Sequence, residues 1–357
     1  ASFEISPDNK YAFLGGHFGY LYGWNIETGV PLFGKEYEEM NRKKLYKIIY
    51  DKYRHRLMAV TDSVLFILDA SNGNIVQQIE MPGVTYAEAS RTGLYVGNDS
   101  GYLYKYDITT HYRPVQKLLL NDNNAPVYQL LLSNDEKILF ARNNYTYLTA
   151  IQTATGKILY NIRDHDYEGS MLAINKEGTL LASAGFDSNI KLYEPGSGKR
   201  IADIYLPLER DAIIIDSAGF YLAPKNSLDA LLFSYNNTAF TYEQFDAQYN
   251  RPDLVLEKLK RSDTATLRNY YTAYKKRLSK LNIKEQPAEK SLQIPTVRLL
   301  DKFAVQTITT EKNFDFWVEC NDNLYLLKNL QVLVNNNPVL GIDGRDLSQL
   351  KTKNSRQ

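Results

Sequence analysis

The chain has 357 residues, of which 42 are basic and 41 acidic, so its formal net charge is +1. This balance excludes the strong positive field with which many proteins hold nucleic acid or an anionic membrane surface. No apolar run reaches the roughly 20 residues of a membrane-spanning helix. The single cysteine excludes an internal disulfide. The 28 tyrosines are typical of half-buried β-sheet surface, so we expect a mainly β protein.

A polar turn recurs six times in the first two thirds of the sequence, at intervals of about 40 to 44 residues. The six turns occupy residues 6–9, 50–53, 90–93, 133–136, 175–178 and 216–219. Each separates two short apolar stretches, and a tighter turn rich in Gly, Asn and Asp follows. This is the period of a four-stranded propeller blade. We therefore predict a β-propeller over residues 1–245, with six blades visible.

The fifth repeat, residues 171–201, is the most regular. Its segment 183–193 resembles a WD40 repeat, with Tyr193 in the place of the tryptophan and Glu194 as the acidic neighbour. The turn Asp164, His165, Asp166 resembles the turn before a WD40 strand, where the histidine orients the turn through a hydrogen bond. Since WD40 propellers commonly have seven blades, the resemblance implies a further blade upstream. A true six-bladed ring is the alternative.

The residues after the propeller change to helical spacing. Asn250 can cap a short helix, Pro252 suits its first turn, and Asp253 lies where the helix dipole favours negative charge. A second helix is predicted over residues 262–283, with Ser262 or Asp263 as its cap. Its basic end, residues 275–280, is interpreted as a solvated face and not as a nucleic-acid or lipid site. We assign residues 246–294 as a helical linker whose last part, 284–294, crosses between domains.

Strand signals return over residues 296–300, 314–318 and 330–334, and a turn at 335–338 leads into 339–341. They predict a small immunoglobulin-like β-sandwich over residues 295–345, followed by a frayed polar tail over 346–357. Cys320 alternates with Phe316 and Val318, which places all three on one face of a strand. We therefore interpret Cys320 as a buried structural residue and not as a nucleophile.

The sequence predicts no catalytic, cofactor-binding or metal-binding residue, and no cofactor. His17, His55, His111 and His165 are scattered, and no pair has the spacing of metal ligands. Each is interpreted as a turn or solvent-facing histidine.

An enzyme built on a propeller would need carboxylates that converge in the central channel. The candidate acids are Asp62, Asp99 and Asp187. Each lies in a tight turn, where an aspartate usually bonds its own backbone, so we expect structural roles for all three.

One run between the propeller and the last domain is the most specific motif in the chain. It consists of Phe245, Asp246, Tyr249, Asn250, Arg251, Pro252 and Asp253. Together with the order of the domains, this run resembles the non-catalytic WD40 and linker portion of bacterial (Bacteroidetes-type) caspase-like proteins of the peptidase C14 class. In that family a caspase-like domain with a histidine–cysteine dyad follows. The resemblance implies a regulatory or targeting region of a cysteine endopeptidase, and Cys320 matches no part of the dyad.

We expect a protein-binding scaffold that performs no chemistry itself and recruits a protein or peptide partner on the propeller face. A caspase-like domain in the same polypeptide is a further expected partner, whereas nucleic acid is not. The alternatives are a stand-alone propeller scaffold and a propeller enzyme of glycosidase or lyase type with its site in the channel. A cytoplasmic location is favoured, with export as the alternative.

Overall fold

The computed structural model describes residues 2–16, 19–40, 43–81, 83–121, 123–235, 238–242, 245–260, 262–280, 285, 295–300, 315–322, 326–334, 337–341 and 344–356. The chain divides into two compact units. The first comprises residues 1–242 and 254–262, and the second comprises residues 243–253 and 263–357. The fold is mainly β, with several four-stranded antiparallel sheets and few helices.

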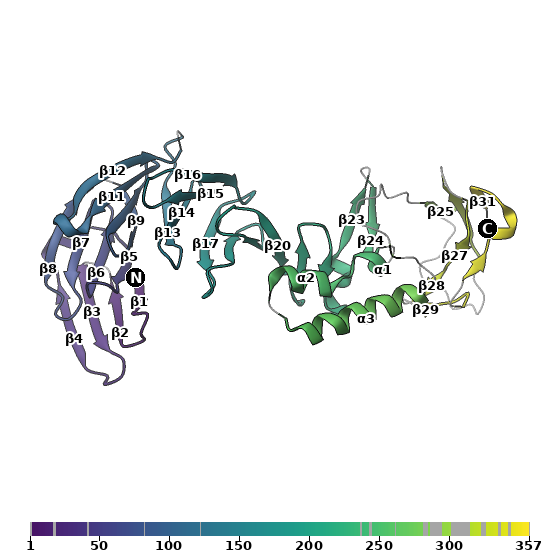
Figure 1. Cartoon of the computed structure of the whole chain (residues 1–357), viewed down its shortest axis with the longest axis horizontal. Coiled ribbons are helices and arrows are strands. Elements are labelled where there is room, and N and C mark those ends of the chain that lie inside the picture. The colour runs from purple at the N-terminus through teal and green to yellow at the C-terminus, as the bar shows by residue number, and fades with distance from the viewer. Residues whose placement is uncertain are drawn as a thin grey trace. The chain divides into compact units, whose positions relative to one another are not determined.

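Five antiparallel sheets follow one another along the first unit, and each is built from consecutive strands (Figure 1). Sheet 1 holds β1 (Ser2–Ile5), β2 (Tyr11–Gly15), β3 (Tyr20–Asn25) and β4 (Pro31–Glu36). Sheet 2 holds β5 (Leu45–Asp51), β6 (Arg56–Thr61), β7 (Val64–Asp69) and β8 (Ile75–Glu80). Sheet 3 holds β9 (Val84–Ala89), β10 (Gly93–Asn98), β11 (Tyr102–Asp107) and β12 (Arg113–Leu119). Sheet 4 holds β13 (Val127–Leu132), β14 (Ile138–Asn143), β15 (Tyr147–Gln152) and β16 (Ile158–Arg163).

Sheet 5 is wider than the others. It begins with β17 (Gly169–Ile174), β18 (Leu181–Gly185), β19 (Asn189–Tyr193) and β20 (Arg200–Tyr205), and then continues with β21 (Ile213–Asp216) and β22 (Tyr221–Leu222). A separate hairpin of β23 (Leu232–Tyr235) and β24 (Thr238–Thr241) follows.

The first strands of successive sheets lie next to one another, in the order β1, β5, β9, β13, β17. Side chains on these strands bond across to the neighbouring sheet. The Ile48 amide donates to Ser2 Oγ at 2.9 Å, and Gln129 Oε1 accepts from the Leu172 amide at 2.7 Å. The two residues of each such bond are about one repeat apart in the sequence. The repeats of the sequence therefore correspond to a series of similar contacts between neighbouring sheets.

Each pair of adjacent sheets encloses its own apolar cluster. Phe13 and Leu21 of sheet 1 pack with Phe66 of sheet 2, for example, and Leu103 of sheet 3 packs with Leu130 of sheet 4. The first unit therefore has four small cores in series, one between each sheet and the next.

All six predicted polar turns join two antiparallel strands. They connect β1 to β2, β5 to β6, β9 to β10, β13 to β14, β17 to β18 and β21 to β22. In the first and fourth turns, Ser6 and Ser133 donate to the aspartate two residues on, with Oγ–Oδ1 distances of 2.6 and 2.7 Å. This bond is the local turn chemistry that the sequence pattern indicated.

The sixth repeat differs from the expected blade. Its strands β21 and β22 do not begin a new sheet but extend sheet 5, with Ile214 opposite Ile204 on β20. A connection of only seven residues, 206–212, links β20 to β21, so the chain turns straight back onto the exposed edge of β20. The last repeat therefore supplies edge strands and a hairpin.

Three helices follow, α1 (Asp246–Tyr249), α2 (Pro252–Leu259) and α3 (Thr264–Lys280). Helix α2 begins at Pro252, as predicted. The Asn250 side chain donates from Nδ2 to Asp246 Oδ1 at 2.9 Å, and its expected capping of α2 stays a prediction. Asp263 is the cap of α3, since its Oδ1 accepts from the Thr266 amide at 2.7 Å. Of the expected linker 284–294, only Glu285 belongs to the described residues.

The end of the second unit contains short β elements. They are β25 (Thr296–Leu300), β26 (Trp317–Asn321), β27 (Asn329–Leu330), β28 (Leu333–Val334), β29 (Asn337–Pro338), β30 (Arg345–Asp346) and β31 (Asn354–Arg356). β25, β26 and β31 form one three-stranded sheet, and the others form two-stranded pairs. An immunoglobulin-like sandwich stays a prediction.

The expected frayed tail is not found. β31 pairs with β26 and places Ser355 opposite Cys320, and Leu347 is buried in a cluster with Val318. Backbone hydrogen bonds need no apolar side chains, so a polar composition did not reveal this strand.

Candidate functional site

A buried group of charged side chains joins sheets 4 and 5. Arg142 Nη2 on β14 lies 2.9 Å from Asp164 Oδ2 in the loop between β16 and β17, and both side chains are fully buried. Arg142 also donates to Ser183 Oγ on β18, and Ser183 Oγ donates to Asp164. A fully buried arginine needs a carboxylate close by, because an unpaired buried charge is strongly unfavourable.

The group extends through His165 and Tyr193. His165 Nδ1 lies 2.8 Å from Asp187 Oδ1, and His165 Nε2 lies 3.1 Å from Ser183 Oγ. Tyr193 donates to Asp164 Oδ1 at 2.6 Å. Burial, and then the neighbouring charge of Asp164, raise the pKa of the Tyr193 hydroxyl, so it remains a donor. We call Arg142, Asp164, His165, Ser183, Asp187, Lys191 and Tyr193 the buried polar network.

Asp187 is ionised within this network. Burial is the largest single influence on the pKa of Asp187, and it opposes ionisation of the carboxyl group. The hydrogen bond and charge of His165, with smaller contributions from the Asp166 amide and Lys191, nevertheless hold the pKa of Asp187 below its usual range. The expectation that this turn aspartate bonds its own backbone is therefore wrong. The expected orienting role of His165 fits its bonds to Asp187 and Ser183.

Three loops lie directly above the buried polar network and bond to one another. The Asp164 amide donates to the Thr146 carbonyl at 2.7 Å, and the Gly169 amide donates to the Tyr145 carbonyl at 2.8 Å. The Phe186 amide donates to the Glu168 carbonyl at 2.9 Å. The turn after β14, the loop before β17 and the turn after β18 are thus held together at one end of sheets 4 and 5.

These loops expose large apolar side chains. The exposed fraction is 69% for Tyr167 and 72% for Phe186, and Tyr145 is also exposed. Met171, near the start of β17 and not on a loop, is exposed as well. We call these four residues the aromatic loop patch. Aromatic side chains on rigid loops are common anchors for a protein partner, because they offer much contact area at little cost in conformational entropy.

Two open hollows lie near the hairpin turns of sheets 4 and 5. The smaller, of about 270 Å³, is lined by Arg200, Lys258 and Leu259 among others, and Lys258 Nζ lies 2.6 Å from Asp216 Oδ2. The larger, of about 610 Å³, is lined in part by Asn134, Glu177 and Lys260. Both are wide surface depressions with mixed polar and apolar linings, which suits a peptide better than a buried small molecule.

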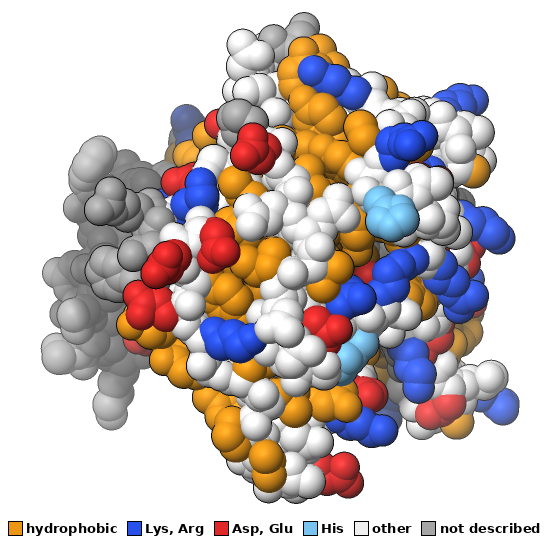
Figure 2. Space-filling view, turned by 90° about the vertical axis from the view of Figure 1, so that its left-hand side faces the viewer, with side chains coloured by type: hydrophobic (Ala, Val, Ile, Leu, Met, Phe, Trp, Pro, Cys, Tyr) orange, Lys and Arg blue, Asp and Glu red, His pale blue; other side chains and the backbone are white. Residues whose placement is uncertain are grey.

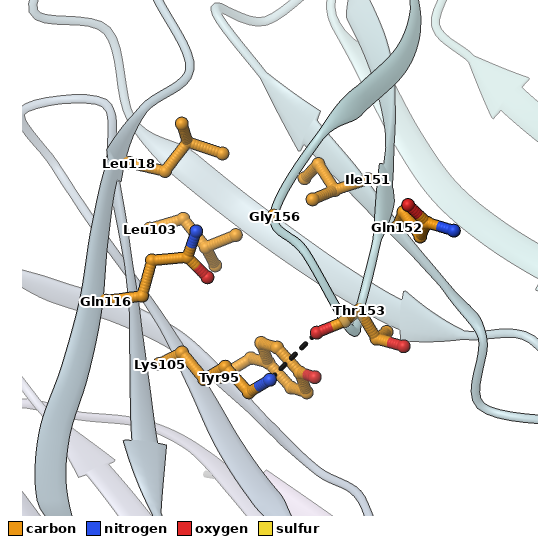
Figure 3. Close-up of a pocket in the computed structure, with 9 residues that line it drawn as sticks. All are labelled: Tyr95, Leu103, Lys105, Gln116, Leu118, Ile151, Gln152, Thr153 and Gly156. Atoms are coloured by element: carbon orange, nitrogen blue, oxygen red, sulfur yellow. Dashed lines mark hydrogen bonds between the residues drawn. The ribbon is translucent and has the colours of Figure 1, made fainter.

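A cavity between sheets 3 and 4 is far smaller, at about 10 Å³ (Figure 3). Lys105 crosses it and donates from Nζ to the Thr153 carbonyl at 2.8 Å, while Leu103, Leu118 and Ile151 supply apolar walls. This volume holds about one water molecule, so the cavity is not a site for a small-molecule ligand.

The first strands of sheets 1 to 3 carry a second set of charged groups. Lys47 on β5 donates from Nζ to the Tyr86 hydroxyl on β9. Burial raises the pKa of Glu88 to about 8, although the charge of Lys47 opposes this shift. Burial also raises the pKa of Glu4. This half-buried carboxyl group is therefore largely protonated at neutral pH.

Charged side chains of both signs lie on the outer surface of the first unit. Figure 2 shows one side of the first unit, where basic side chains gather toward the right-hand edge, acidic ones lie among them as well as toward the left, and hydrophobic side chains lie between. A partner that binds here would meet regions of both signs.

The predicted family motif forms a compact cluster in the second unit. Arg251 donates to Asp253 through Nε and Nη2, at 2.9 and 2.7 Å, and its guanidinium lies 4.0 Å from the centroid of the Tyr274 ring. The rings of Phe245 and Tyr249 are 6.1 Å apart. Bidentate pairing and ring stacking fix the arginine, so Arg251 joins Asp253 at the start of α2 to Tyr274 on α3.

The remaining predicted residues are dispersed. Among the described histidines, the Nδ1 atom of His55 lies 2.6 Å from the Tyr50 hydroxyl oxygen, and the backbone carbonyl of His111 accepts from Gln77. His17 lies outside the described residues. Asp62 and Asp99 accept hydrogen bonds from Ser63 and Ser100, at 3.1 and 2.8 Å.

Within the described ranges, no three His, Cys, Asp or Glu side chains come together as a metal site requires. Cys320 is buried, and burial raises the pKa of its thiol. Each helix of the described chain is too short or too polar to cross a membrane.

The buried polar network was the main feature that sequence reasoning missed. Arg142 is an ordinary charged residue in a strand pattern, and its carboxylate partner lies 22 residues away in a loop. The one available signal was a charged residue directly after the apolar stretch 138–141, with the acidic turn Asp164–Asp166 two strands later.

Comparisons with known proteins give little further information. No protein-family model matches the sequence, and no curated protein matches it. Among solved structures, the chain is similar to one in a crystal structure of the mitotic checkpoint complex, with 15% identity and a TM-score of 0.49. That match covers 60% of this chain and 69% of the other.

Proposed function

We propose that this chain is a protein-binding scaffold and that the aromatic loop patch is its contact surface for a protein or peptide partner. The observation that carries the proposal is the exposure of Tyr167 and Phe186 on loops that are bonded together above a buried charged network. A surface that stays rigid while it exposes aromatic side chains loses little entropy on binding.

The alternative of a propeller enzyme has less support. Asp62 and Asp99 bond to neighbouring serines in separate turns, and Asp187 is occupied by His165. A catalytic pair of carboxylates would need to face a common cavity. These three aspartates act as turn and network residues in the present arrangement.

The scaffold proposal can be tested by affinity capture with matched variants. Tyr167→Ser with Phe186→Ser removes both anchors, and Leu208→Ser removes an exposed leucine in the β20–β21 connection as a control. We expect at least one protein to be enriched by the wild type and by Leu208→Ser, and lost with the double variant. Equal enrichment by all three proteins would refute a role for the patch.

We further propose, from the resemblance of the motif Asn250–Asp253, that the scaffold serves a caspase-like cysteine peptidase and recruits its partner or substrate. The stacked and paired Arg251 supports this only as a structural element of the linker. The test is active-site labelling of the full-length natural protein with a cysteine-directed peptide ketone, followed by mapping of the labelled residue. Labelling of a cysteine in a separate domain supports the proposal, whereas no labelling, or labelling of Cys320, would reject it.

A further inference from the structure

The two hollows near the hairpin turns of sheets 4 and 5 adjoin each other, because they share the lining residues Thr179, Glu194 and Lys260. Their walls come from the β13–β14, β17–β18 and β19–β20 turns and from the end of α2, all within the first unit. We call the combined depression the turn-end trough. Since antiparallel strands turn alternately at their two ends, the trough lies at the opposite end of β14 and β18 from the turns that carry Tyr145 and Phe186.

The walls of the turn-end trough are bonded to one another. Asn134 Nδ2 in the β13–β14 turn donates to the carbonyls of Asn175 and Lys176 in the β17–β18 turn, at 3.0 and 2.8 Å. Lys258 Nζ on α2 lies 2.6 Å from Oδ2 of Asp216, whose side chain is fully buried at the end of β21. The depression is therefore already formed, and a ligand that enters it need not order these walls.

The smaller hollow has an apolar floor. Its floor consists of three half-buried aliphatic side chains from three different elements, Leu180, Ile201 and Leu259. They lie just before β18, on β20 and at the end of α2. Burying an apolar side chain of a ligand on this floor would remove it from water, which is favourable.

Basic side chains surround that floor. Lys199 and Lys260 are exposed, and among the described residues neither pairs with a carboxylate. Arg200 also lines this hollow, but it already donates from Nε to Asp203 Oδ1 at 2.5 Å. The two lysines are therefore available to an acidic group of a ligand, beside a place for an apolar side chain.

The larger hollow has the opposite charge. Three carboxylates line it, Asp135, Glu177 and Glu194. A hydrogen bond from Ser133 Oγ holds the pKa of Asp135 below its usual value, so this group is charged at neutral pH. Lys137 does not line the trough and lies 3.4 Å from Asp135, but both are largely exposed, so their pairing is weak. A basic side chain of a ligand would therefore be attracted to this end.

We propose that the turn-end trough is a second binding site, for an extended peptide segment of a partner protein with charges of both signs. An aliphatic side chain of that segment lies on the floor of the smaller hollow, and an acidic residue next to it pairs with Lys199 and Lys260. A basic residue further along meets the carboxylates of the larger hollow. A small anion would leave the apolar floor uncovered, whereas a segment of one charge would be repelled at one of the two ends.

The first test selects peptides from a random displayed library on the immobilised whole chain. We expect the enriched sequences to share an aliphatic residue beside Asp or Glu, with Lys or Arg at a fixed distance from them. The affinity of one enriched peptide is then measured by fluorescence polarisation. Lys199→Glu with Lys260→Glu should weaken its binding about tenfold or more, because an attraction becomes a repulsion. Lys10→Glu with Lys157→Glu makes the same change of charge at exposed positions outside the trough, and it should bind like the wild type.

A charge exchange makes the test specific. The same peptide with lysine in place of its acidic residue should bind the Lys199→Glu, Lys260→Glu variant more tightly than the wild type, which a merely unfolded variant could not do. Enrichment of peptides without the mixed-charge pattern, or unchanged binding to that variant, overturns the proposal. Tyr167→Ser with Phe186→Ser should leave the affinity unchanged. Loss of binding in that variant alone would place the peptide on the aromatic loop patch, which overturns the trough site and supports the proposed function.

Discussion

The Nη2 atom of Arg142 lies 2.9 Å from the Oδ2 atom of Asp164, and neither side chain is exposed to solvent. This ion pair connects β14 of sheet 4 with the loop that leads into sheet 5. Other sheet contacts of this unit are formed mainly by aliphatic and aromatic side chains. The stability of this contact therefore depends on the completeness of its polar bonds.

The first prediction concerns Arg142. Arg142→Met leaves Asp164 buried without its cation, and we expect a loss of about 3–5 kcal/mol in the free energy of unfolding of the first unit. Urea unfolding followed by fluorescence measures it. The control is Arg163→Met, since Arg163 lies 3.8 Å from Asp166 and both side chains are largely exposed. An exposed pair of this kind contributes at most about 1 kcal/mol. Equal losses in the two variants would contradict the assigned role of the buried pair.

The second prediction concerns Gly169. A Cβ atom at this position would lie 1.3 Å from Arg142 Nη1, so Gly169→Ala must displace the arginine. We expect a destabilisation of about 1–3 kcal/mol, as for other overpacked sites. Gly196→Ala is the matched control, because a Cβ there would meet nothing within 4 Å. A native-like melting temperature for Gly169→Ala would show that the loop before β17 can move without cost.

The third prediction is a pH dependence that arises from Glu88. Its pKa lies at about 8 in the folded chain, above its ordinary value of 4.5, so the folded state binds more protons than the unfolded state between these values. The stability contribution of this group is complete below pH 4.5 and is lost as pH rises through about 8.

Glu88→Gln removes this ionisation. We expect the variant to melt about 2–4 °C above the wild type at pH 9, the shift that roughly 1 kcal/mol produces in a domain of this size. At pH 5 the two proteins should melt at nearly the same temperature. A melting difference that is independent of pH would show that Glu88 does not titrate in this window.

The fourth prediction concerns the second unit. Arg251→Lys keeps the charge but removes the two-pronged bond to Asp253 and the stacking on Tyr274. We expect a loss of about 1–3 kcal/mol, because a lysine reproduces neither geometry. Arg298→Lys is the control, since Arg298 is exposed and makes one bond, to Glu319. The protection of the α3 backbone amides against hydrogen exchange measures the loss of stability in this unit directly. Unchanged protection in Arg251→Lys would mean that the arginine is not what fixes the helix.

The hairpin turns were predictable from sequence because their chemistry is local. Ser6 and Ser133 each bond an aspartate two residues away, and such bonds depend on only a few neighbouring side chains. The helix start at Pro252 and the cap at Asp263 were predictable for the same reason. These elements require no knowledge of distant contacts.

Contacts between sheets could not be predicted in this way. Arg142 meets Asp164 only after two further strands have folded, and the bond between His165 and Asp187 replaces the local bond expected for that aspartate. The pairing of β21 likewise depends on the free edge of β20. Nothing in residues 213–216 themselves indicates that they pair with this edge. Tertiary context decided each of these cases.

The construction of the first unit has a consequence for how it can fold and change. Each sheet consists of consecutive residues and contacts mainly its immediate neighbours, and the first strands are joined by side-chain bonds at intervals of about one repeat. Local contacts of this range favour rapid formation of each sheet as soon as its segment is available. One sheet could thus be duplicated or deleted in evolution, and the array would gain or lose a module while the remaining contacts kept their register.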